Sequence, residues 1–295
     1  MKLAIIGIHQ VISGLSGKLK EQDFFKLFGT YLTDTRTLKV SQSAVISPFG
    51  LINHADAVIF YKTDEASFNL MIEAVKNSRQ ILILNPHSLT VEETNELIKV
   101  SAEADVEMLV WSKYKCMPVC LRLAEEQPET RRILIEKHVV FSRDADMKET
   151  IHHDLAYLVD LAMGLIHANL KKIVPNITVA GDREIVDLHL DFDNGSVAII
   201  HAGSVTDATS CTAELVTAGA VYEISPDKNT FVKKTFGKSI HAETKTVKGI
   251  DNDLAVLRQF ANALTSEPHG LTTLQDFFKT QVVIRALLDK REMMK

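Results

Sequence analysis

Residues 57–91 hold the pattern that most constrains this chain: two short apolar runs with a helical segment between them. Ala57 to Tyr61 is rich in Val, Ile and aromatic residues and too short for a helix, so it predicts a buried strand. A helix is predicted from Glu65 to Asn77, and the second strand, Ile81 to Leu84, stops at Asn85-Pro86. Strand, helix and strand within this span indicate a βαβ unit with parallel strands. A ligand would sit beyond the carboxyl ends of those strands, although a purely structural βαβ unit remains an alternative.

The turn after the first expected strand bears on dinucleotide binding. Lys2 to Ile8 is apolar, and a phosphate-binding turn would need G-x-G-x-x-G directly after it. Gly7 supplies the first glycine, whereas His9 and Ile12 stand at the second and third positions. A side chain at the second position blocks close approach of a pyrophosphate, and a branched one at the third weakens helix–strand packing. The turn is therefore consistent with a dinucleotide-binding type of fold, but it predicts weak cofactor binding.

The stretch from residue 20 to residue 55 gives a less regular pattern. Phe24 to Phe28 suggests a helix, and Leu38 to Ser47 suggests one or two short strands. No strand here ends in an acidic residue that would bind a ribose hydroxyl, because Asp34, the nearest candidate, is interpreted as a turn residue in LTDTR. The nucleotide-binding half therefore looks shortened.

The pattern changes from helical to alternating after Ile173. Polar and apolar residues alternate up to Asp193-Asn194-Gly195, a strong hairpin turn, and further short strands follow it. Parallel βαβ units first and an antiparallel sheet second predict two domains, of α/β and α+β class. We expect a Rossmann-like NAD(P)-binding-type domain over residues 1–112 and a substrate and oligomerisation domain over residues 113–295, whose last helices return to the first domain.

Composition and charge exclude several classes of protein. The formal charge of −5 argues against nucleic acid as the main partner, because no domain-wide basic excess is present. Three cysteines without a CxxC motif are interpreted as buried free thiols of a reducing compartment. MKLAIIGI is too short for a signal peptide, and no stretch reaches the length of a membrane span. A cytoplasmic protein is expected.

Four motifs, taken in order, resemble one known family. They are LILNPHSLTVEE, VWSKYKCMP, IHHDLAYLVDLAMG and VDLHLDFDNGSVAIIHAGS. Over most of its length the chain resembles the glucose–fructose oxidoreductase/inositol dehydrogenase (Gfo/Idh/MocA) family. The resemblance implies a Rossmann domain with NAD or NADP, a small-molecule substrate, and an α+β domain whose open sheet carries the substrate face and the contact of a homo-oligomer.

The resemblance also implies where the site residues stand. Asn85 takes the place of the family's E-K-P lysine beside the nicotinamide, and an amide carries no charge and cannot act as an acid. His153 matches the histidine of the H-x-x-D helix, whereas the aspartate position falls on Ala156. Lys115 matches an arginine of the VWSKYKCMP segment and would supply positive charge. The expected catalytic residues are thus His153, Asn85 and Lys115; the expected cofactor-binding residues are Gly7, His9, Thr63, Asn85 and Pro86.

Purely structural roles remain alternatives for these residues. A lone helical histidine is more often a hydrogen-bonded structural residue than a catalyst, and Lys115 could be a solvated loop lysine. No third ligand stands at a defined spacing from His152 and His153, so no metal site is expected.

Two functions compete at this point. The first is an NAD(P)-dependent oxidoreductase of a sugar, cyclitol or nucleotide-sugar hydroxyl, catalytically impaired, with His153 as the acid–base group. The second is a non-catalytic small-molecule-binding or interaction protein on the same scaffold. The loss of the turn glycines, the lysine and the ribose acid motivates the second function, because three losses at one site are hard to reconcile with efficient hydride transfer.

Overall fold

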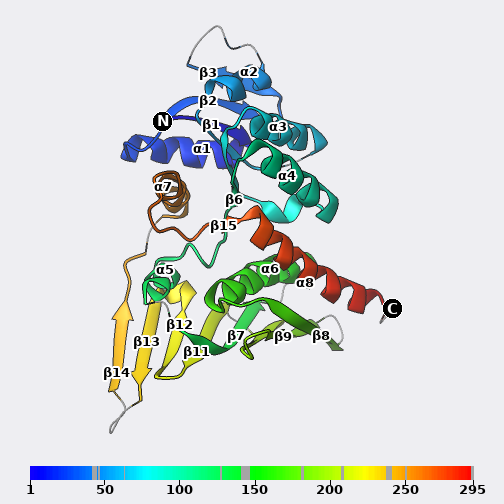
Figure 1. Cartoon of the computed structure of the whole chain (residues 1–295), viewed down its shortest axis with the longest axis vertical. Coiled ribbons are helices and arrows are strands. Elements are labelled where there is room, and N and C mark those ends of the chain that lie inside the picture. Colours follow the sequence, from blue (N-terminus) through cyan, green and yellow to red (C-terminus); the bar gives the residue numbers. More distant parts are fainter. Residues whose placement is uncertain are drawn as a thin grey trace. The chain divides into compact units, whose positions relative to one another are not determined.

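The computed structural model describes residues 1–41, 45, 47–62, 64–126, 128–140, 147–180, 183–206, 209–236, 241–249 and 251–293. The side chains of residues 140, 147–153, 180, 183, 204–206 and 241 are not described. The chain divides into two compact units: Met1–Trp111 with Ile250–Phe278, and Ser112–Gly249 with Lys279–Lys295. The first unit therefore takes in a C-terminal segment as well as the expected N-terminal domain (Figure 1).

The first unit is built on a mostly parallel sheet in the order β15-β6-β5-β4-β1-β2-β3. Its inner pairs are parallel, while the edge strands β3 and β15 pair antiparallel with β2 and β6. The strands are β1 (Lys2–Gly7), β2 (Lys26–Leu32), β3 (Thr37–Val40), β4 (Ala57–Phe60), β5 (Gln80–Ile83), β6 (Met108–Val110) and β15 (Thr272–Thr273). The helices are α1 (His9–Lys18), η1 (Leu19–Glu21), α2 (Pro48–His54), α3 (Glu65–Lys76), η2 (Pro86–Ser88), α4 (Val91–Ala104), α7 (Asn252–Leu264) and the first turns of α8 (Leu274–Glu292).

The βαβ unit forms as the sequence predicts. All four residues of β4 are buried, and β4 pairs in parallel with β5. Asp64 and Ser67 form a reciprocal capping box at the start of α3, and Thr90 and Glu93 do the same for α4. These caps satisfy backbone donors that a helix start leaves unpaired, so they fix where both helices begin.

The predicted helix around Phe24 to Phe28 is wrong, because this segment leads into strand β2. Phe25 packs on Phe260 of α7, whereas Phe28 lies in the cluster that contains Leu51 of α2. Two buried aromatics three residues apart imitate a helical period here. In an extended chain the same odd spacing puts two side chains on opposite faces, as Phe25 and Phe28 are here. The β1–β2 register also shifts at this point, with Leu3 opposite Leu27 and Ala4 opposite Gly29.

The second unit carries a largely antiparallel sheet in the order β14-β13-β12-β11-β7-β10-β9-β8, in which only the described β7–β10 pair is parallel. The strands are β7 (Thr130–Val140), β8 (Leu170–Ala180), β9 (Arg183–Phe192), β10 (Val197–Thr206), β11 (Ser210–Thr217), β12 (Ala220–Ser225), β13 (Thr230–Thr235) and β14 (His241–Thr246). The helices are α5 (Pro118–Glu125), α6 (Met147–Leu165), η3 (Pro226–Lys228) and the later turns of α8.

One face of this sheet is buried under helices. Its core joins residues of the sheet such as Ile135 and Leu188 to Leu158 of α6, Leu123 of α5 and Val283 of α8. The predicted Asp193-Asn194-Gly195 turn joins β9 to β10, and Gly195 takes a positive φ of 79°. The predicted fold class, a Rossmann-like sheet followed by an open, largely antiparallel sheet, is confirmed.

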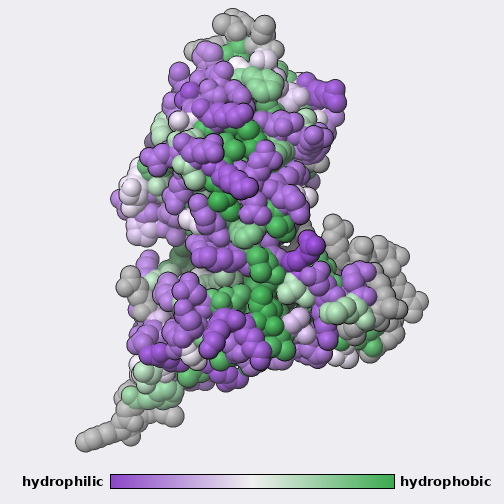
Figure 2. Space-filling model, turned by 45° about the vertical axis from the view of Figure 1, so that its right-hand side comes forward, coloured by the Kyte–Doolittle hydropathy of each residue, from purple (hydrophilic) through white to green (hydrophobic). Residues whose placement is uncertain are grey.

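Hydrophilic residues cover most of the face shown in Figure 2, and hydrophobic residues reach the surface between them. Within the described part of the chain, no helix is both long enough and apolar enough to cross a membrane.

Candidate functional site

The carboxyl ends of β1, β4 and β5 lie side by side in the first unit, where the sequence predicts a crevice. Gly7 ends β1, and a Cβ atom added to it would stand 2.7 Å from the Cβ of Tyr61. The backbone amide of Tyr61 donates to the Ile6 carbonyl at 2.8 Å, which holds the two strand ends together. Gly7 is therefore needed for strand packing, whether or not a phosphate approaches it.

Helix α1 begins directly after this glycine. Its N-cap, Ile8, has an extended backbone and makes no side-chain capping bond, and the first turn has no acidic residue. The first backbone amides of α1 are thus left without a side-chain cap, as at helix starts that receive anions. His9 is exposed at this start, and Ile12 is buried beneath it.

Asn85 does not present a free amide at the end of β5. Its Oδ1 accepts a hydrogen bond from the Lys62 backbone amide at 2.7 Å, and its Nδ2 donates to the Lys62 carbonyl at 2.6 Å. The side chain therefore joins the end of β5 to the chain that leaves β4. Its backbone angles, φ −120° and ψ 66°, fall short of the extended conformation that the following proline favours.

Lys62 supplies a cation at these strand ends that sequence reasoning missed. Its side chain is 10% exposed, and its Nζ donates to the Ser88 carbonyl at 2.9 Å and lies 3.2 Å from Glu93 Oε1. The other oxygen of Glu93 accepts from the Thr90 amide in the α4 capping box. Lys62 thus stabilises the β5–α4 loop. Its position just after a predicted buried strand is the sequence signal from which this lysine could have been found.

The remaining predicted cofactor residues lie close by or outside the described chain. Pro86 is buried and occupies the first turn of η2. Thr63 lies outside the described residues. Asp34 Oδ1 accepts from the Thr35 amide at 2.9 Å in the β2–β3 turn, so it acts as the turn residue that the sequence predicts.

A small pocket adjoins the end of β2. It has a volume of about 230 Å³ and is lined by Thr33, Arg36, Asp64 and residues of α2 and α3. Arg36 lies in the turn that follows β2, the strand end near which a dinucleotide fold binds its ribose, and an arginine nearby accommodates a 2′-phosphate.

In the second unit, Lys115 lies against α6. Its Nζ is 3.7 Å from Asp160 Oδ1, and its side chain is 21% exposed. A Cβ atom added to Gly164 would stand 3.1 Å from Lys115 Cε, so the absence of a side chain at Gly164 makes room for the lysine. His153 lies in α6, but its side chain is outside the described residues.

A cluster of charged residues next to Asp154 was missed by sequence reasoning. Lys113 Nζ lies 3.3 Å from Asp154, and Lys137, which is only 3% exposed, lies 3.7 Å from Asp154 and 3.9 Å from Asp227. Both ammonium groups also stand over the Tyr114 ring, at 5.2 and 5.8 Å from its centroid. The alternation of Ile133, Ile135 and Lys137 in β7 was the signal that this lysine faces the core.

Burial sets the proton affinity of the groups around this cluster. Desolvation raises the pKa of the Tyr114 phenol, and it raises the pKa of the Cys211 thiol to about 12. The thiols of Cys116 and Cys120 also have raised pKa values, chiefly because they are buried. All three cysteines are buried and free, so the prediction of buried free thiols is confirmed. These thiols are poor nucleophiles at neutral pH.

The predicted residues thus fall into two groups. Gly7, His9, Asn85 and Pro86 belong to the first unit, and Lys115 and His153 belong to the second. No set of three or more His, Cys, Asp or Glu side chains suited to a metal ion occurs in the part of the chain that the structure describes.

Solved structures with the same fold include dehydrogenases and other oxidoreductases. The chain is similar to UDP-N-acetylglucosamine 3-dehydrogenase from Acidithiobacillus ferrooxidans, with 17% identity, a TM-score of 0.78 and 97% and 96% of the two chains covered. A dehydrogenase from Chromobacterium violaceum has 17% identity, a TM-score of 0.79 and coverage of 98% and 95%. An oxidoreductase from Sinorhizobium meliloti has 14% identity, a TM-score of 0.75 and coverage of 99% and 98%.

The sequence itself matches no protein-family model and no curated protein. At these identities the likeness to the solved structures establishes the fold over the whole chain. The resemblance to the Gfo/Idh/MocA family that the motifs indicated is confirmed at that level.

Proposed function

We propose that this chain, which shares the two-domain fold of dehydrogenases, is a Gfo/Idh/MocA-like NAD(P)-dependent oxidoreductase in which hydride transfer is impaired. Its substrate class would be a hydroxyl of a sugar, cyclitol or nucleotide sugar. The fold, the pocket beside Arg36 and the uncapped start of α1 support a nucleotide-binding ancestry.

One observation carries the proposal of impaired chemistry. Both polar atoms of the Asn85 amide bond the Lys62 backbone, which fixes the side chain at the strand end where the resembled family has a lysine. The Lys62 ammonium group cannot replace that lysine without giving up Glu93 and the Ser88 carbonyl. An amide carries no charge to stabilise a developing alkoxide. The strand end therefore lacks the group that would polarise the substrate.

The residues at the strand ends fit a complete nicotinamide cofactor poorly. A pocket adjoins the strand end near which a ribose would bind, but His9 adds a side chain at the phosphate turn, and the Asn85 amide is occupied where the nicotinamide would lie. We therefore expect dissociation constants for NAD(H) and NADP(H) well above micromolar, and we derive no reaction step through the cofactor.

The proposed roles in the second unit follow the resemblance. His153 would handle the hydroxyl proton, because an imidazole has a pKa near neutral. Lys115 would orient the substrate, and its pairing with Asp160 at 3.7 Å holds its side chain along α6. Asp154, between Lys113 and Lys137, is an additional carboxylate on the same helix.

A second candidate function is a non-catalytic binding or interaction protein on the same scaffold. The observation that favours it is structural: Asn85, Lys62 and Glu93 together tie β4, β5 and α4 to one another. Such a network stabilises a loop without requiring chemistry there. The two candidates differ in whether any turnover remains.

Cofactor titration separates these possibilities from an intact dehydrogenase. Trp111, the only tryptophan of the chain, donates its backbone amide to the Ile83 carbonyl at 2.8 Å, beside the end of β5. Its fluorescence should therefore report NADH or NADPH bound at these strand ends. We expect weak or no quenching at micromolar cofactor. Saturation at micromolar NADH or NADPH would contradict the proposal of an impaired site.

We also propose a second copy of this chain as a partner, through the sheet of the second unit. Two partly exposed histidine–carboxylate pairs stand on neighbouring strands there: His201 Nδ1 lies 2.5 Å from Asp187 and His189 Nε2 lies 3.1 Å from Asp191. Ile199 lies opposite His189 in the ladder and is partly exposed. Light scattering should give a mass above the 32.8 kDa of one chain, reduced by Ile199→Lys. A wild-type monomer would contradict this proposal.

A further inference from the structure

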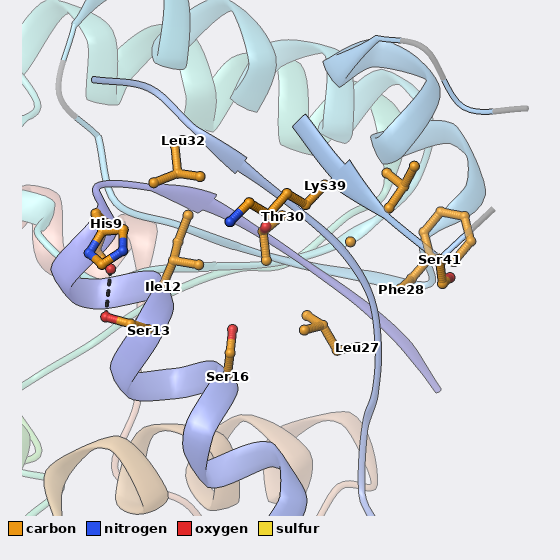
Figure 3. Close-up of a pocket in the computed structure, with 12 residues that line it drawn as sticks. His9, Ile12, Ser13, Ser16, Leu27, Phe28, Thr30, Leu32, Lys39 and Ser41 are labelled. Atoms are coloured by element: carbon orange, nitrogen blue, oxygen red, sulfur yellow. Dashed lines mark hydrogen bonds between the residues drawn. The ribbon is translucent and has the colours of Figure 1, made fainter. Parts of the chain in front are cut away.

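A groove runs along the sheet of the first unit between α1 and the β2–β3 hairpin. Its volume is about 400 Å³, and it is lined from His9 at the start of α1 down to Ser16, and along β2 and β3 (Figure 3). The phosphate turn adjoins one end of the groove, at His9, whereas Ser16, Thr30 and Lys39 line it further along.

The local backbone explains why this groove is open and partly polar. The register shift at the start of the β1–β2 pair leaves Phe28 without a partner on β1. Phe28 belongs to the cluster that contains Leu51 of α2 and also lines the groove, together with Leu27 and Thr30. On β3, Lys39 and Val40 line the groove, and Leu38 and Val40 pack against the same cluster as Phe28. In this way a lysine and a threonine face α1.

Three polar groups converge in the groove without partners. The Lys39 ammonium group points into it beside Thr30 (Figure 3), and it has no ion pair or hydrogen bond among the described residues. Thr30 is 6% exposed, and its hydroxyl likewise has no hydrogen bond to a described group. Ser16 Oγ is buried and unpaired within the described chain. The Lys39 side chain is exposed, so its ammonium group is open to a ligand, and a ligand oxygen would supply the partner that the buried Ser16 hydroxyl lacks.

The lining also indicates the charge of the ligand. No Asp or Glu is among the described residues that line the groove, whereas Lys39 and His9 are there. Ile12 and Leu27 add apolar wall. An anion with several acceptor oxygens suits one ammonium and two hydroxyl donors that come from different elements, and a phosphate group has three such oxygens.

From this geometry we propose that the groove between α1 and the β2–β3 hairpin binds a small phosphate monoester. The phosphate is held by Lys39, Thr30 and Ser16, and its organic part lies against Ile12 and Leu27. This site goes beyond the proposed oxidoreductase function and does not depend on it.

The test uses the full-length protein and phenyl phosphate as the probe, with calorimetry to measure the dissociation constant. Lys39→Met should weaken binding at least tenfold. Thr30→Val should weaken it several-fold without lowering the urea midpoint, because the hydroxyl makes no bond in the protein. A purely structural threonine would instead lower the midpoint, which would overturn its assignment as a ligand.

Two control variants identify where the probe binds. Lys99→Met removes an exposed lysine of α4 that lies outside the groove and has no ion pair among the described residues, so it should leave binding unchanged. Arg36→Met removes the cation of the pocket at the end of β2 and should also leave binding unchanged.

Four results would overturn the proposal. They are no heat of binding with wild-type protein at millimolar phenyl phosphate, equal binding by Lys39→Met, loss of binding in Arg36→Met instead, or benzoate binding as tightly as phenyl phosphate. The last result would mean that the groove recognises any anion on an aromatic ring.

Discussion

Removing the Asn85 side chain should destabilise the first unit. Asn85→Ala deletes one bond of 2.7 Å and one of 2.6 Å and leaves the Lys62 amide and carbonyl without their partners. A typical hydrogen bond contributes about 0.5–1.5 kcal/mol net, and an unsatisfied partner adds to the loss, so we expect about 2 kcal/mol. With a denaturant slope of about 2 kcal/mol per molar, the urea midpoint should fall by roughly 1 M.

Urea unfolding followed by Trp111 fluorescence is the assay for this variant, because Trp111 is the last residue of the N-terminal segment of the first unit and so reports the unfolding of that unit. Asn95→Ala is the matched control: the same atoms are removed from a helical asparagine that makes no side-chain hydrogen bond among the described residues. Its midpoint should stay the same or rise slightly, since alanine favours a helix. If Asn85→Ala unfolds at the wild-type midpoint, the amide does not hold β4 to β5, and our reason for excluding it from chemistry fails.

Three further variants test the packing and charge of the two units. Gly7→Ala should lower the unfolding free energy by about 1–3 kcal/mol because its Cβ meets Tyr61, whereas Gly17→Ala, with open space around it in α1, should raise it by about 0.5–1 kcal/mol; equal urea midpoints would contradict this. Lys137→Met should lower the free energy of unfolding by about 3 kcal/mol, because Asp154 and Asp227 lose the buried cation that lies between them. A urea midpoint as high as that of Lys99→Met would show that these ion pairs do not stabilise the fold. The hydrogen bond from Lys233, at 2.6 Å, lowers the pKa of Glu126, so this carboxylate stabilises the fold above its unfolded pKa and the stability is lost as pH falls through the folded value. At neutral pH the wild type should therefore have a higher urea midpoint than Glu126→Gln, and the two midpoints should converge at pH values below the usual pKa range of carboxyl groups. A difference that stays constant with pH would refute the assignment.

The parts of the fold that depend on local pattern could be predicted from the sequence. The capping boxes at Asp64 and Thr90, the alternation before Gly195 and the apolar run of β4 each follow from the chemistry of neighbouring residues. The strand β2 could not be predicted in this way. Its aromatic spacing fits a helix as well as a strand, and the pairing with β1, a contact between segments distant in sequence, decides between them.

The candidate site shows the same limit. The sequence places Asn85 at a strand end, but its bonds to Lys62, 23 residues earlier, depend on how β4 and β5 pair. Lys137 could have been found from the alternation of β7, whereas its partners Asp154 and Asp227 come from a helix and a turn distant in sequence. Local sequence patterns do not predict contacts between distant segments. Those contacts decide whether a polar side chain is free to react.

The most direct test of impaired hydride transfer is turnover by the unmodified protein. NADH and NADPH absorbance should be followed with a panel of sugars, cyclitols and nucleotide sugars in both reaction directions, and the same panel should be run with Asn85→Lys and with Asn85→Lys combined with His9→Gly and Ile12→Gly. We expect at most weak turnover from the wild type and no increase with Asn85→Lys alone, because His9 and Ile12 still occupy the phosphate turn. A complete lack of turnover from every variant would favour the non-catalytic candidate. Robust turnover by the wild-type protein would contradict the account, since it would show that a strand end whose amide and lysine are both engaged still supports the reaction.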